Sequence, residues 1–378
     1  RYSRATIQHR LTSMLPRSLK TSAYILSATL FCQAAQADIE IQTIAEGFDT
    51  PWSIAELPNS EGFLVTERPG GLHRVSSSGE TEAISGVPAV FAKRQGGLFD
   101  VVLHPDFETN NALFLAYAAG SEESNRTTVA RATLDGNALT DLKVIFEVTP
   151  NKKGGGHFGG RMAFLADGTL LLSVGEGYIL REDAQKKESQ LGKLLRMTEM
   201  GEAPTDNPFS DAPYVYSYGH RNPQGLIVDA PTQTIWMTEH GPKGGDELNK
   251  ITAGRNYGWP TSAYGFTYGL ENIYELDHSQ EYEEPIYFFT PSIGISELTI
   301  YEGKEFPRWN DFIFITSLKD MTIYTLKLDS ERENVIHVGK MYIGERIRDI
   351  TIAKDGRLVM AGDLGSLIIA SRTEKDIP

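Results

Sequence analysis

One short stretch decides the fold of this chain, and it reads Met162-Ala163-Phe164-Leu165-Ala166-Asp167-Gly168-Thr169-Leu170-Leu171-Leu172-Ser173-Val174. Two apolar runs flank the dipeptide Asp167-Gly168. An Asp-Gly pair between apolar runs is a strong hairpin signal, because both residues accept the positive φ of tight hairpin turns. We therefore predict a strand over Met162–Leu165, a turn, and a second strand over Thr169–Val174.

The same order of apolar run, polar turn and second apolar run recurs along the chain. There are six copies, so each occupies roughly 57 of the residues that follow residue 37. The other five predicted pairs are Trp52–Leu57 with Gly62–Thr66, Leu98–Leu103 with Leu113–Tyr117, Leu226–Val228 with Thr234–Thr238, Leu298–Tyr301 with Phe312–Thr316, and Ile350–Ile352 with Leu358–Ala361.

Further strands follow several of these pairs, namely Leu72–Val75, Thr128–Leu134, Lys193–Met197, Ile323–Leu328 and Leu367–Ala370. Six units of about four short strands favour an all-β fold, a six-bladed β-propeller of four-stranded antiparallel blades. Two packed sheets are the alternative, but so many strands in one chain favour a closed ring. We expect Ile39–Ala45 to pair with the last blade and close that ring.

The first 37 residues have the order of a secretory signal peptide. A basic start, a short apolar run and a small-x-small motif follow one another as Met14 with Arg17 and Lys20, Ala23–Phe31, and Ala35-Gln36-Ala37. We expect residues 1–13 to be upstream sequence and cleavage to follow Ala37. The apolar run is too short to span a bilayer, so we predict no stable membrane insertion. Residues 38–378 would then form a single β-propeller catalytic domain in the periplasm or outside the cell.

The composition is that of an acidic globular protein. The chain has 378 residues, 50 acidic and 36 basic, and one cysteine, which lies in the predicted signal peptide. Removal of the five basic residues of 1–37 changes the formal net charge from −14 to −19. Such a charge disfavours non-specific binding to nucleic acid. The acidity itself indicates either calcium binding or simply solubility.

Polar residues stand beside equivalent strands of five predicted blades, in Gln95-Gly96-Gly97, Gly154–Arg161, Gly219–Gln224, Ser317-Leu318-Lys319 and Arg346–Asp349. Four of them are cations, namely Arg221, Lys319, Arg346 and Arg348. Converging cations repel one another in an empty site, so they indicate a polyanionic ligand. The alternative is that each pairs with the carboxylate next to it, Arg348 with Asp349 and Lys319 with Asp320.

His157 is the candidate general base. It lies among five glycines, which let a backbone approach a ligand closely and would leave the imidazole exposed at the rim. A histidine near its ordinary pKa is the usual proton acceptor at neutral pH. An incidental loop histidine is the alternative.

The segment from Glu239 to Tyr257 has the oxygen ligands that calcium prefers. Gly241-Pro242 offers backbone carbonyls, and Asp246-Glu247 offers carboxylates. A plain acidic turn remains the alternative. The sequence holds no cysteine pair for zinc and no glycine-rich nucleotide fingerprint, which disfavours zinc and nicotinamide cofactors.

Taken together, these motifs resemble a known family. The residues that carry the resemblance are Gly97-Leu98 with His104-Pro105-Asp106-Phe107, His157-Phe158-Gly159-Gly160-Arg161, Gly219-His220-Arg221-Asn222-Pro223-Gln224-Gly225, Glu239-His240-Gly241-Pro242, Asp246-Glu247-Leu248-Asn249, Asn256-Tyr257-Gly258-Trp259-Pro260, Ser317-Leu318-Lys319 and Arg346-Ile347-Arg348-Asp349. Over the whole chain after residue 50, they resemble the soluble quinoprotein glucose/sorbosone dehydrogenases, and within them the aldose sugar dehydrogenases.

The resemblance implies pyrroloquinoline quinone (PQQ), a planar tricarboxylate, as the cofactor. The residues that it would place at the cofactor are Arg221, Asn222, His240, Lys319, Arg346 and Arg348, with Gln95 at the cofactor or sugar side. An aldose sugar would be the substrate, and a quinone or dye would accept the electrons.

The resemblance also implies calcium and a reaction. The carbonyls of Gly241 and Pro242 would hold a calcium ion that polarises the quinone, and Glu247 with the Tyr257 carbonyl would hold a second, structural ion. His157 would take the proton of the anomeric hydroxyl while C1 loses hydride, which yields a lactone.

Two residues depart from the pattern of the glucose-specific members. They are Gly156, directly before the histidine, and His240 in the calcium loop. With short loops on the active face, they favour a broad-range aldose enzyme. A calcium-dependent propeller lactonase or esterase, and a non-enzymatic binding propeller, are the other hypotheses.

Overall fold

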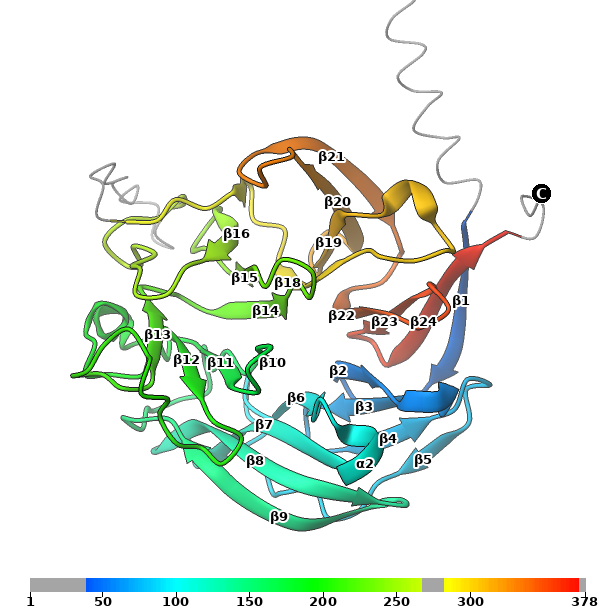
Figure 1. The fold of residues 1–378 in the computed structure, drawn as a ribbon, viewed down its shortest axis with the longest axis horizontal. Helices are drawn as coiled ribbons and strands as arrows, with labels where there is room; N and C mark the ends of the chain where they lie inside the picture. The colour runs from blue at the N-terminus through cyan, green and yellow to red at the C-terminus, as the bar shows by residue number, and fades with distance from the viewer. Residues whose placement is uncertain (1–38, 267–281, 374–378) are drawn as a thin grey trace, which may run out of the picture. The chain divides into compact units, whose positions relative to one another are not determined.

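The computed structural model describes residues 39–266 and 282–373. Within them the strands form six separate four-stranded sheets that surround a common centre (Figure 1). This is a six-bladed β-propeller, which confirms the predicted fold class and excludes two packed sheets. The predicted signal peptide lies outside the described residues.

Each blade is an antiparallel sheet whose strands follow chain order from the centre outward, except in the last. Blade 1 contains β2 (Pro51–Glu56), β3 (Phe63–Glu67), β4 (Leu72–Val75) and β5 (Thr81–Ala83). Blade 2 contains β6 (Leu98–Leu103), β7 (Ala112–Gly120), β8 (Asn125–Asp135) and β9 (Ala138–Glu147). Blade 3 contains β10 (Met162–Phe164), β11 (Leu170–Val174), β12 (Lys193–Met197) and β13 (Val215–Tyr218).

The second half repeats the pattern. Blade 4 contains β14 (Pro223–Val228), β15 (Ile235–Glu239), β16 (Asp246–Ile251) and β17 (Tyr287–Phe289). Blade 5 contains β18 (Ile295–Ile300), β19 (Phe312–Ser317), β20 (Thr322–Leu328) and β21 (Val335–Tyr342). Blade 6 contains β22 (Ile347–Ile352), β23 (Leu358–Gly362), β24 (Ser366–Arg372) and β1 (Ile39–Glu46).

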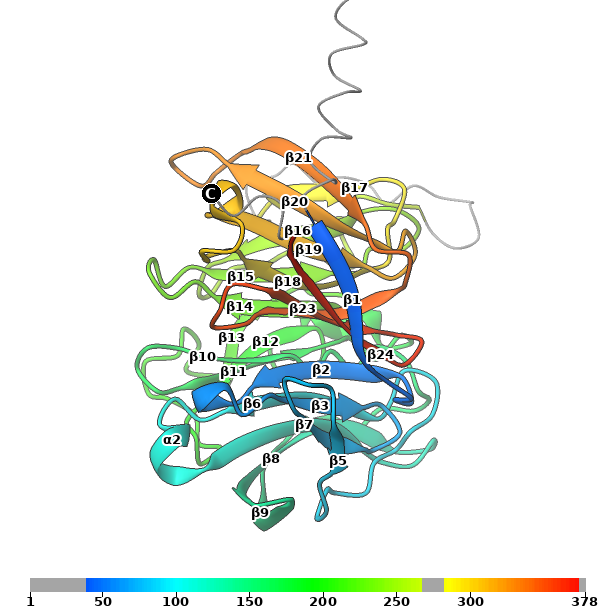
Figure 2. The same ribbon diagram turned by 90° about the vertical axis from the view of Figure 1, so that its right-hand side faces the viewer.

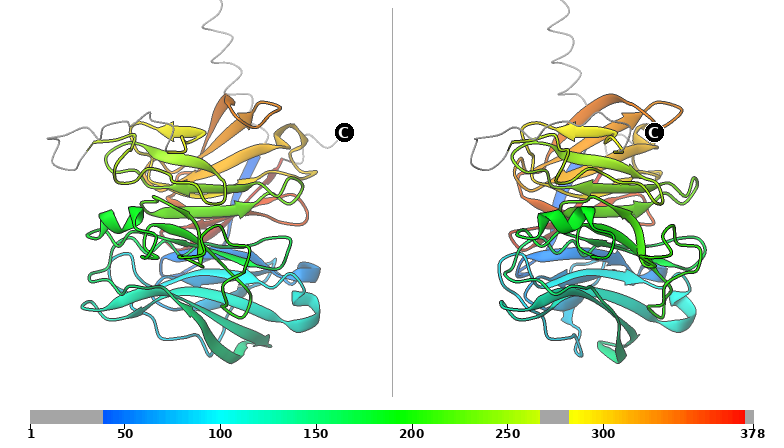
Figure 3. Two further views of the ribbon diagram at one scale, coloured as in Figure 1. Left: turned by 60° about the vertical axis from the view of Figure 1, so that its left-hand side comes forward. Right: turned by 90° about the vertical axis from the view of Figure 1, so that its left-hand side faces the viewer.

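Helical residues are few among the described residues. They form α2 (Phe107–Asn110), η1 (Pro58–Ser60), η2 (Arg181–Gln185) and η3 (Pro307–Trp309). In the described part of the chain, no helix has the length and apolar character needed to cross a membrane. Most connections between the described strands are loops rather than helices (Figure 3).

The predicted hairpin at Asp167-Gly168 is confirmed. β10 and β11 pair antiparallel with Met162 opposite Leu172, and Gly168 takes a φ of 82°. The Asp167 carboxylate accepts the backbone N–H of Thr169 at 2.9 Å, which satisfies a donor that the turn leaves open. The last blade repeats this turn at Asp355 and Gly356.

The ring closes as predicted. β1 pairs with β24, so the first and last described strands share one sheet (Figures 1 and 2). Such pairing removes the free edge that an open ring would expose.

The core lies between neighbouring blades. Leu64 and Leu72 of blade 1 are buried in one cluster with Leu113 and Leu115 of blade 2. Burial of each leucine side chain contributes about 2 kcal/mol. Apolar packing between blades thus holds neighbouring sheets in place, and with them the loops that build the site.

Candidate functional site

A cavity of about 280 Å³ receives residues from all six blades. Trp52 lies on β2 of blade 1, Phe99 on β6 of blade 2, and Phe158 in the loop before β10 of blade 3. Their rings form one aromatic wall, because Phe99 lies 5.4 Å from Trp52 and 5.5 Å from Phe158 between ring centroids. An aromatic wall of this kind suits a flat ligand.

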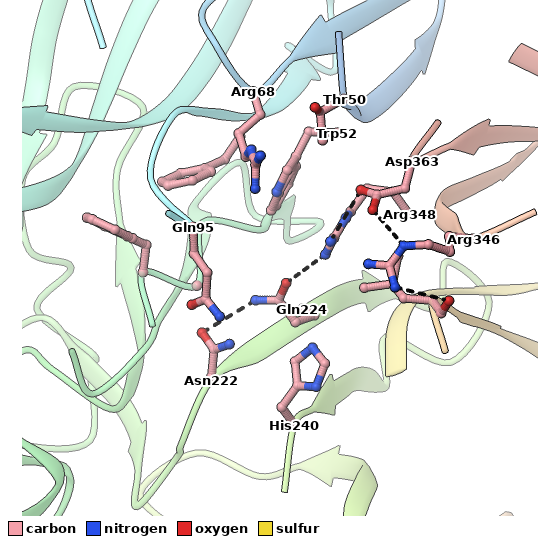
Figure 4. A pocket seen from close by; sticks show the side chains of 14 residues that line it. Thr50, Trp52, Arg68, Gln95, Asn222, Gln224, His240, Arg346, Arg348 and Asp363 are labelled. Atoms are coloured by element: carbon pink, nitrogen blue, oxygen red, sulfur yellow. Dashed lines mark hydrogen bonds and ion pairs between the residues drawn. The ribbon is translucent and has the colours of Figure 1, made fainter. Parts of the chain in front are cut away.

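Cations dominate the polar lining of this cavity. Arg346 and Arg348 line it from blade 6, and Asp363 lies between them (Figure 4). Asp363 binds Arg346 Nε at 2.9 Å and Arg348 Nη2 at 3.6 Å. Burial lowers the pKa of Arg348 to about 10, although Asp363 opposes this shift. Arg68 of blade 1 adds a third guanidinium, so the lining carries an excess of positive charge suited to an anion.

The alternative, in which Arg348 and Lys319 pair with the carboxylates next to them in sequence, does not hold. Arg348 pairs with Asp363 and not with Asp349. Lys319 donates to the carbonyl of Ser292 at 2.7 Å instead of pairing with Asp320. The physical reason for Arg348 is that it and Asp349 are consecutive residues of β22, where successive side chains point to opposite faces of the sheet.

Amide side chains connect the arginines to the other wall of the cavity. Arg348 Nη1 donates to Gln224 Oε1 at 3.1 Å, and Gln224 Nε2 donates to Asn222 Oδ1 at 3.4 Å (Figure 4). Gln95 also lines the cavity, and its Oε1 accepts the backbone N–H of His157 at 2.7 Å. The structure therefore brings Gln95, Asn222, Arg346 and Arg348 together, as the sequence predicts.

Lys319 and Arg221 lie elsewhere. Lys319 is exposed and does not line this cavity. Arg221 lines a second hollow of about 370 Å³ together with Glu176, Pro242 and Trp259. Its Nη1 donates to the carbonyl of His240 at 3.1 Å, and its guanidinium lies 5.1 Å from the Trp259 ring centroid.

His157 is buried, not exposed at the rim as the sequence suggests. Only 5% of the residue is accessible, because Tyr178 packs edge-on against its ring at 5.1 Å. A Cβ added at Gly156 would lie 2.9 Å from Tyr178 Cβ, so glycine there permits this contact. His157 also takes a φ of 47°, the left-handed region that is uncommon for a residue with a side chain.

The protonation state of His157 follows from its partner. Nδ1 lies 2.9 Å from Oε1 of Glu176, which is 1% accessible. An ionised carboxylate can only accept, so Nδ1 carries the proton and Nε2 keeps its lone pair. Burial lowers the pKa of His157, and the hydrogen bond that His157 donates to Glu176 opposes this shift. The pKa is thus not the ordinary one that the sequence suggests, and the imidazole is a neutral base at neutral pH.

Sequence reasoning missed Glu176 and Lys152. Lys152 Nζ lies 3.4 Å from the Phe158 ring centroid and donates to the Gly154 carbonyl at 3.3 Å. Burial lowers the pKa of Lys152 to about 7, against the attraction of Glu176. The available signal is the order Gly175-Glu176-Gly177 directly after an apolar strand, where a carboxylate is unusual.

The predicted calcium residues gather around a small gap of about 10 Å³. Gly241, Pro242, Glu247 and Tyr257 line it together with Glu239. The same gap is lined by His240, whose pKa burial lowers to about 4. A gap of this size has room for about one particle the size of a water molecule.

Two carboxylates at this gap are held close together. Asn249 Nδ2 donates to Glu239 Oε1 at 3.0 Å and to Glu247 Oε2 at 3.1 Å. Burial, and then the charge of Glu239, raise the pKa of Glu247 well above its ordinary value. Asn249 Oδ1 is buried without a hydrogen-bond partner. A cation here would neutralise both carboxylates, so these residues fit calcium.

Asp246 is not a free ligand, contrary to the sequence interpretation. Its Oδ2 accepts the backbone N–H groups of Ile293, Gly294 and Ile295 at 3.0, 2.9 and 3.1 Å. Its Oδ1 accepts the Gly241 N–H at 3.1 Å. Asp246 therefore shapes the loop that carries Gly241. Among the described residues, no cluster of three or more His, Asp or Glu side chains has the geometry of a metal site.

Ser217, His220 and Glu239 have the atom order of a hydrolase triad. Ser217 Oγ lies 2.8 Å from His220 Nε2, and His220 Nδ1 lies 3.0 Å from Glu239 Oε1. Ser217 and His220 are fully buried, and Tyr257 stacks on the imidazole at 4.7 Å. A nucleophile needs access to its substrate, so this triad is structural.

Comparison with known proteins agrees with this geometry. The family model for glucose/sorbosone dehydrogenase matches residues 48–369. An uncharacterised Synechocystis protein, slr1608, is 42% identical over 91% of this chain and 89% of its own length. The aldose sugar dehydrogenase YliI of Escherichia coli is 35% identical over 90% of this chain and 94% of its own.

One similar solved structure contains PQQ. It is the PQQ-bound form of an aldose sugar dehydrogenase from Streptomyces coelicolor. It is 27% identical to this chain, with a TM-score of 0.74. The match covers 89% of this chain and 99% of that one.

Proposed function

The chain belongs to the glucose/sorbosone dehydrogenase family, and on that premise we propose that it is a PQQ- and calcium-dependent aldose dehydrogenase. It oxidises the anomeric hydroxyl of aldoses to lactones and passes the electrons to a quinone or dye. The observation that carries the proposal is the hydrogen bond between His157 and Glu176 beside a cavity lined by three arginines.

The lining of the cavity supports PQQ as its ligand. Arg68, Arg346 and Arg348 would hold carboxylates, and the wall of Trp52, Phe99 and Phe158 would cover a flat ring system. The gap beside Gly241 and Pro242 supports a calcium ion close by. When bound, PQQ supplies the two-electron acceptor for the hydride that leaves C1, and calcium supplies the Lewis acid that polarises its reactive carbonyl.

The residues of the chain account for the proton. Nε2 of His157 accepts the proton of the anomeric hydroxyl as the C1–H bond breaks and the C1–O bond becomes a carbonyl. Glu176 holds the ring in the correct tautomer and stabilises the imidazolium that forms. Tyr178 packs against the imidazole and contributes to the burial that lowers its pKa, so the base is neutral when the substrate binds.

Broad aldose specificity, and action in the periplasm or outside the cell, complete the proposal. Gly156 and His240 support the first through their departure from the glucose-specific pattern. The leader-like order of residues 1–37 supports the second.

The two other hypotheses find less support. A propeller lactonase needs a metal among carboxylates in the central channel, but there Arg161 lies among Asp100, Glu297 and Asp349. A binding propeller would not need a buried base paired with a carboxylate beside a cationic cavity.

The test is reconstitution. Purified apo-protein with added PQQ and calcium should reduce a dye when an aldose is present. His157→Ala should lower this rate by roughly 10²- to 10⁴-fold, the usual contribution of a general base. His104→Ala is the matched control, because His104 also pairs with a glutamate, at 3.1 Å, but away from the cavity. Absence of activity with every aldose, or full activity in His157→Ala, would overturn the proposal.

A further inference from the structure

Arg161 ends the motif that also contains His157, but the proposed reaction gives it no role. It is only 2% accessible and lies among three acidic side chains from other blades. Its Nε lies 2.7 Å from Glu297, and its Nη1 lies 3.1 Å from Asp349 and 3.7 Å from Asp100. A charge is costly to bury unless it is paired, and these three acidic side chains pair the buried guanidinium.

The same guanidinium also holds three backbone carbonyls. Nε donates to the carbonyl of Gln224 at 2.9 Å. Nη2 donates to the carbonyls of Trp52 at 3.4 Å and Arg348 at 3.2 Å. Trp52, Gln224 and Arg348 belong to blades 1, 4 and 6, and the side chains of all three line the arginine-lined cavity.

Arg161 therefore connects every blade at one point. Its own loop precedes blade 3, the carboxylates come from blades 2, 5 and 6, and the carbonyls come from blades 1, 4 and 6. Each carboxylate also accepts a backbone N–H from another blade: Asp349 from Ile54 at 2.5 Å, Asp100 from Met162 at 2.8 Å, and Glu297 from Leu226 at 3.0 Å.

We propose that Arg161 is the positioning residue of the cofactor cavity. It sets the starts of β2, β14 and β22 relative to one another, and so it sets where the side chains of Trp52, Gln224 and Arg348 meet a planar anion. Only arginine offers a planar fork of donors that can serve carbonyls and carboxylates together. The identity of the anion rests on the proposed function, but the positioning role does not.

The competing explanation is that Arg161 only neutralises buried carboxylates and stabilises the fold. Arg161→Lys separates the two, because lysine keeps the charge and cannot make all of these hydrogen bonds. Arg196→Lys is the matched control. Arg196 is also a buried arginine with two carboxylate partners, Asp167 and Asp206, but it lies on β12 away from the cavity.

The first measurement is the affinity of the apo-protein for PQQ, by quenching of tryptophan fluorescence in the presence of calcium. Arg161→Lys should raise the Kd for PQQ by at least about tenfold, as small displacements of binding groups do. Arg196→Lys should change the Kd for PQQ by less than about twofold, even where it lowers the Tm as much as Arg161→Lys does. The KM for the sugar in PQQ-saturated protein should stay near that of the wild type. An unchanged Kd in Arg161→Lys would overturn the positioning role.

The second measurement needs no PQQ. Hydrogen exchange of the apo-protein should become faster at the starts of β2, β14 and β22 together in Arg161→Lys, and not in Arg196→Lys. Unchanged exchange at these strands overturns the inference. A wild type that does not bind PQQ overturns the proposed function instead, and the exchange result still decides the role of Arg161.

A further variant covers failure of Arg161→Lys to fold. Asp349→Asn keeps the oxygen that accepts the Ile54 N–H, and its new NH₂ group then faces Arg161 Nη1. Two donors that face each other should displace the guanidinium, while Asp100 and Glu297 remain as its acidic partners. Asp349→Asn should show the same faster exchange at β2, β14 and β22, and exchange equal to that of the wild type contradicts the proposal.

Discussion

Oε1 of Glu176 lies 2.9 Å from Nδ1 of His157, and both side chains are almost completely buried. The two residues are far from adjacent, because one lies in the loop before β10 and the other follows β11. The β10–β11 hairpin brings them together. The base of the proposed reaction is thus half of a dyad built by the hairpin that decides the fold.

Glu176→Gln should reduce kcat and move the pH profile. Glu176 raises the pKa of His157 by its hydrogen bond and its charge, so its loss should lower that pKa further. The acid limb of kcat/KM should move to lower pH, and the rate at neutral pH should fall by roughly 10- to 100-fold as the tautomer is no longer fixed. A pH series on both proteins measures this.

Glu199→Gln is the control, since it removes the carboxylate partner of the distant His104. An acid limb that moves to higher pH in Glu176→Gln would contradict the assignment.

Arg348→Gln should weaken the binding of PQQ. A lost charge-assisted hydrogen bond costs about 2 kcal/mol, which corresponds to roughly a thirtyfold higher Kd. The wild-type affinity should also fall as salt increases, because the attraction is between charges. Fluorescence titration at two salt concentrations measures both effects. Arg357→Gln of the same blade, which pairs with Asp355 at the surface, should bind PQQ like the wild type. Equal affinities for both variants would exclude Arg348 from the cofactor site.

Calcium should stabilise the apo-protein through Glu247. Chelation should lower the Tm of the wild type, and added calcium should restore it, because an ion that binds only the folded state shifts the folding equilibrium. Glu247→Ala should lose the calcium-dependent part of the Tm. Glu333→Ala changes a surface glutamate paired with Lys250 at 2.5 Å and should keep that part. Differential scanning calorimetry measures the Tm, and an unchanged wild-type Tm after chelation would contradict a calcium ion at the gap that Glu247 lines.

Glu297 should make stability depend on pH. Burial raises its pKa from 4.5 to about 8, although Arg161 opposes the shift. The folded state therefore binds a proton that the unfolded state has lost. The contribution of Glu297 to the free energy of unfolding is therefore fully present below pH 4.5 and is lost as pH rises through about 8. Glu297→Gln carries no titrating group, so its Tm should decline less than that of the wild type between these pH values. Parallel Tm curves would show that Glu297 does not titrate in this range.

The sequence predicts the fold well because its signals are local. The turn at Asp167-Gly168 and the alternation of short strands with polar turns depend on neighbours in the chain. The third strands at Leu72–Val75 and Lys193–Met197 coincide with β4 and β12. Closure of the ring by the first strand follows from the count of strands, and the structure confirms it.

The candidate site is only partly predictable, because its partners are distant in sequence. The motifs identify His157, Arg346 and Arg348, and the last two do line the cavity. They do not reveal Asp363, which directly follows β23 and pairs with both arginines because the end of β23 lies beside the start of β22. Nor do they reveal that Lys319 lies outside the lining, since loop direction depends on packing between blades and not on residue order.

The most direct test of the proposed function is a single turnover without an external electron acceptor. The wild-type protein, loaded with PQQ and calcium under anaerobic conditions, should convert about one equivalent of an aldose to its lactone, because one bound quinone takes one hydride. His157→Ala, loaded equally, should form lactone at least about a hundredfold more slowly. No lactone from the wild type, or equal rates in the two proteins, would contradict the proposed function.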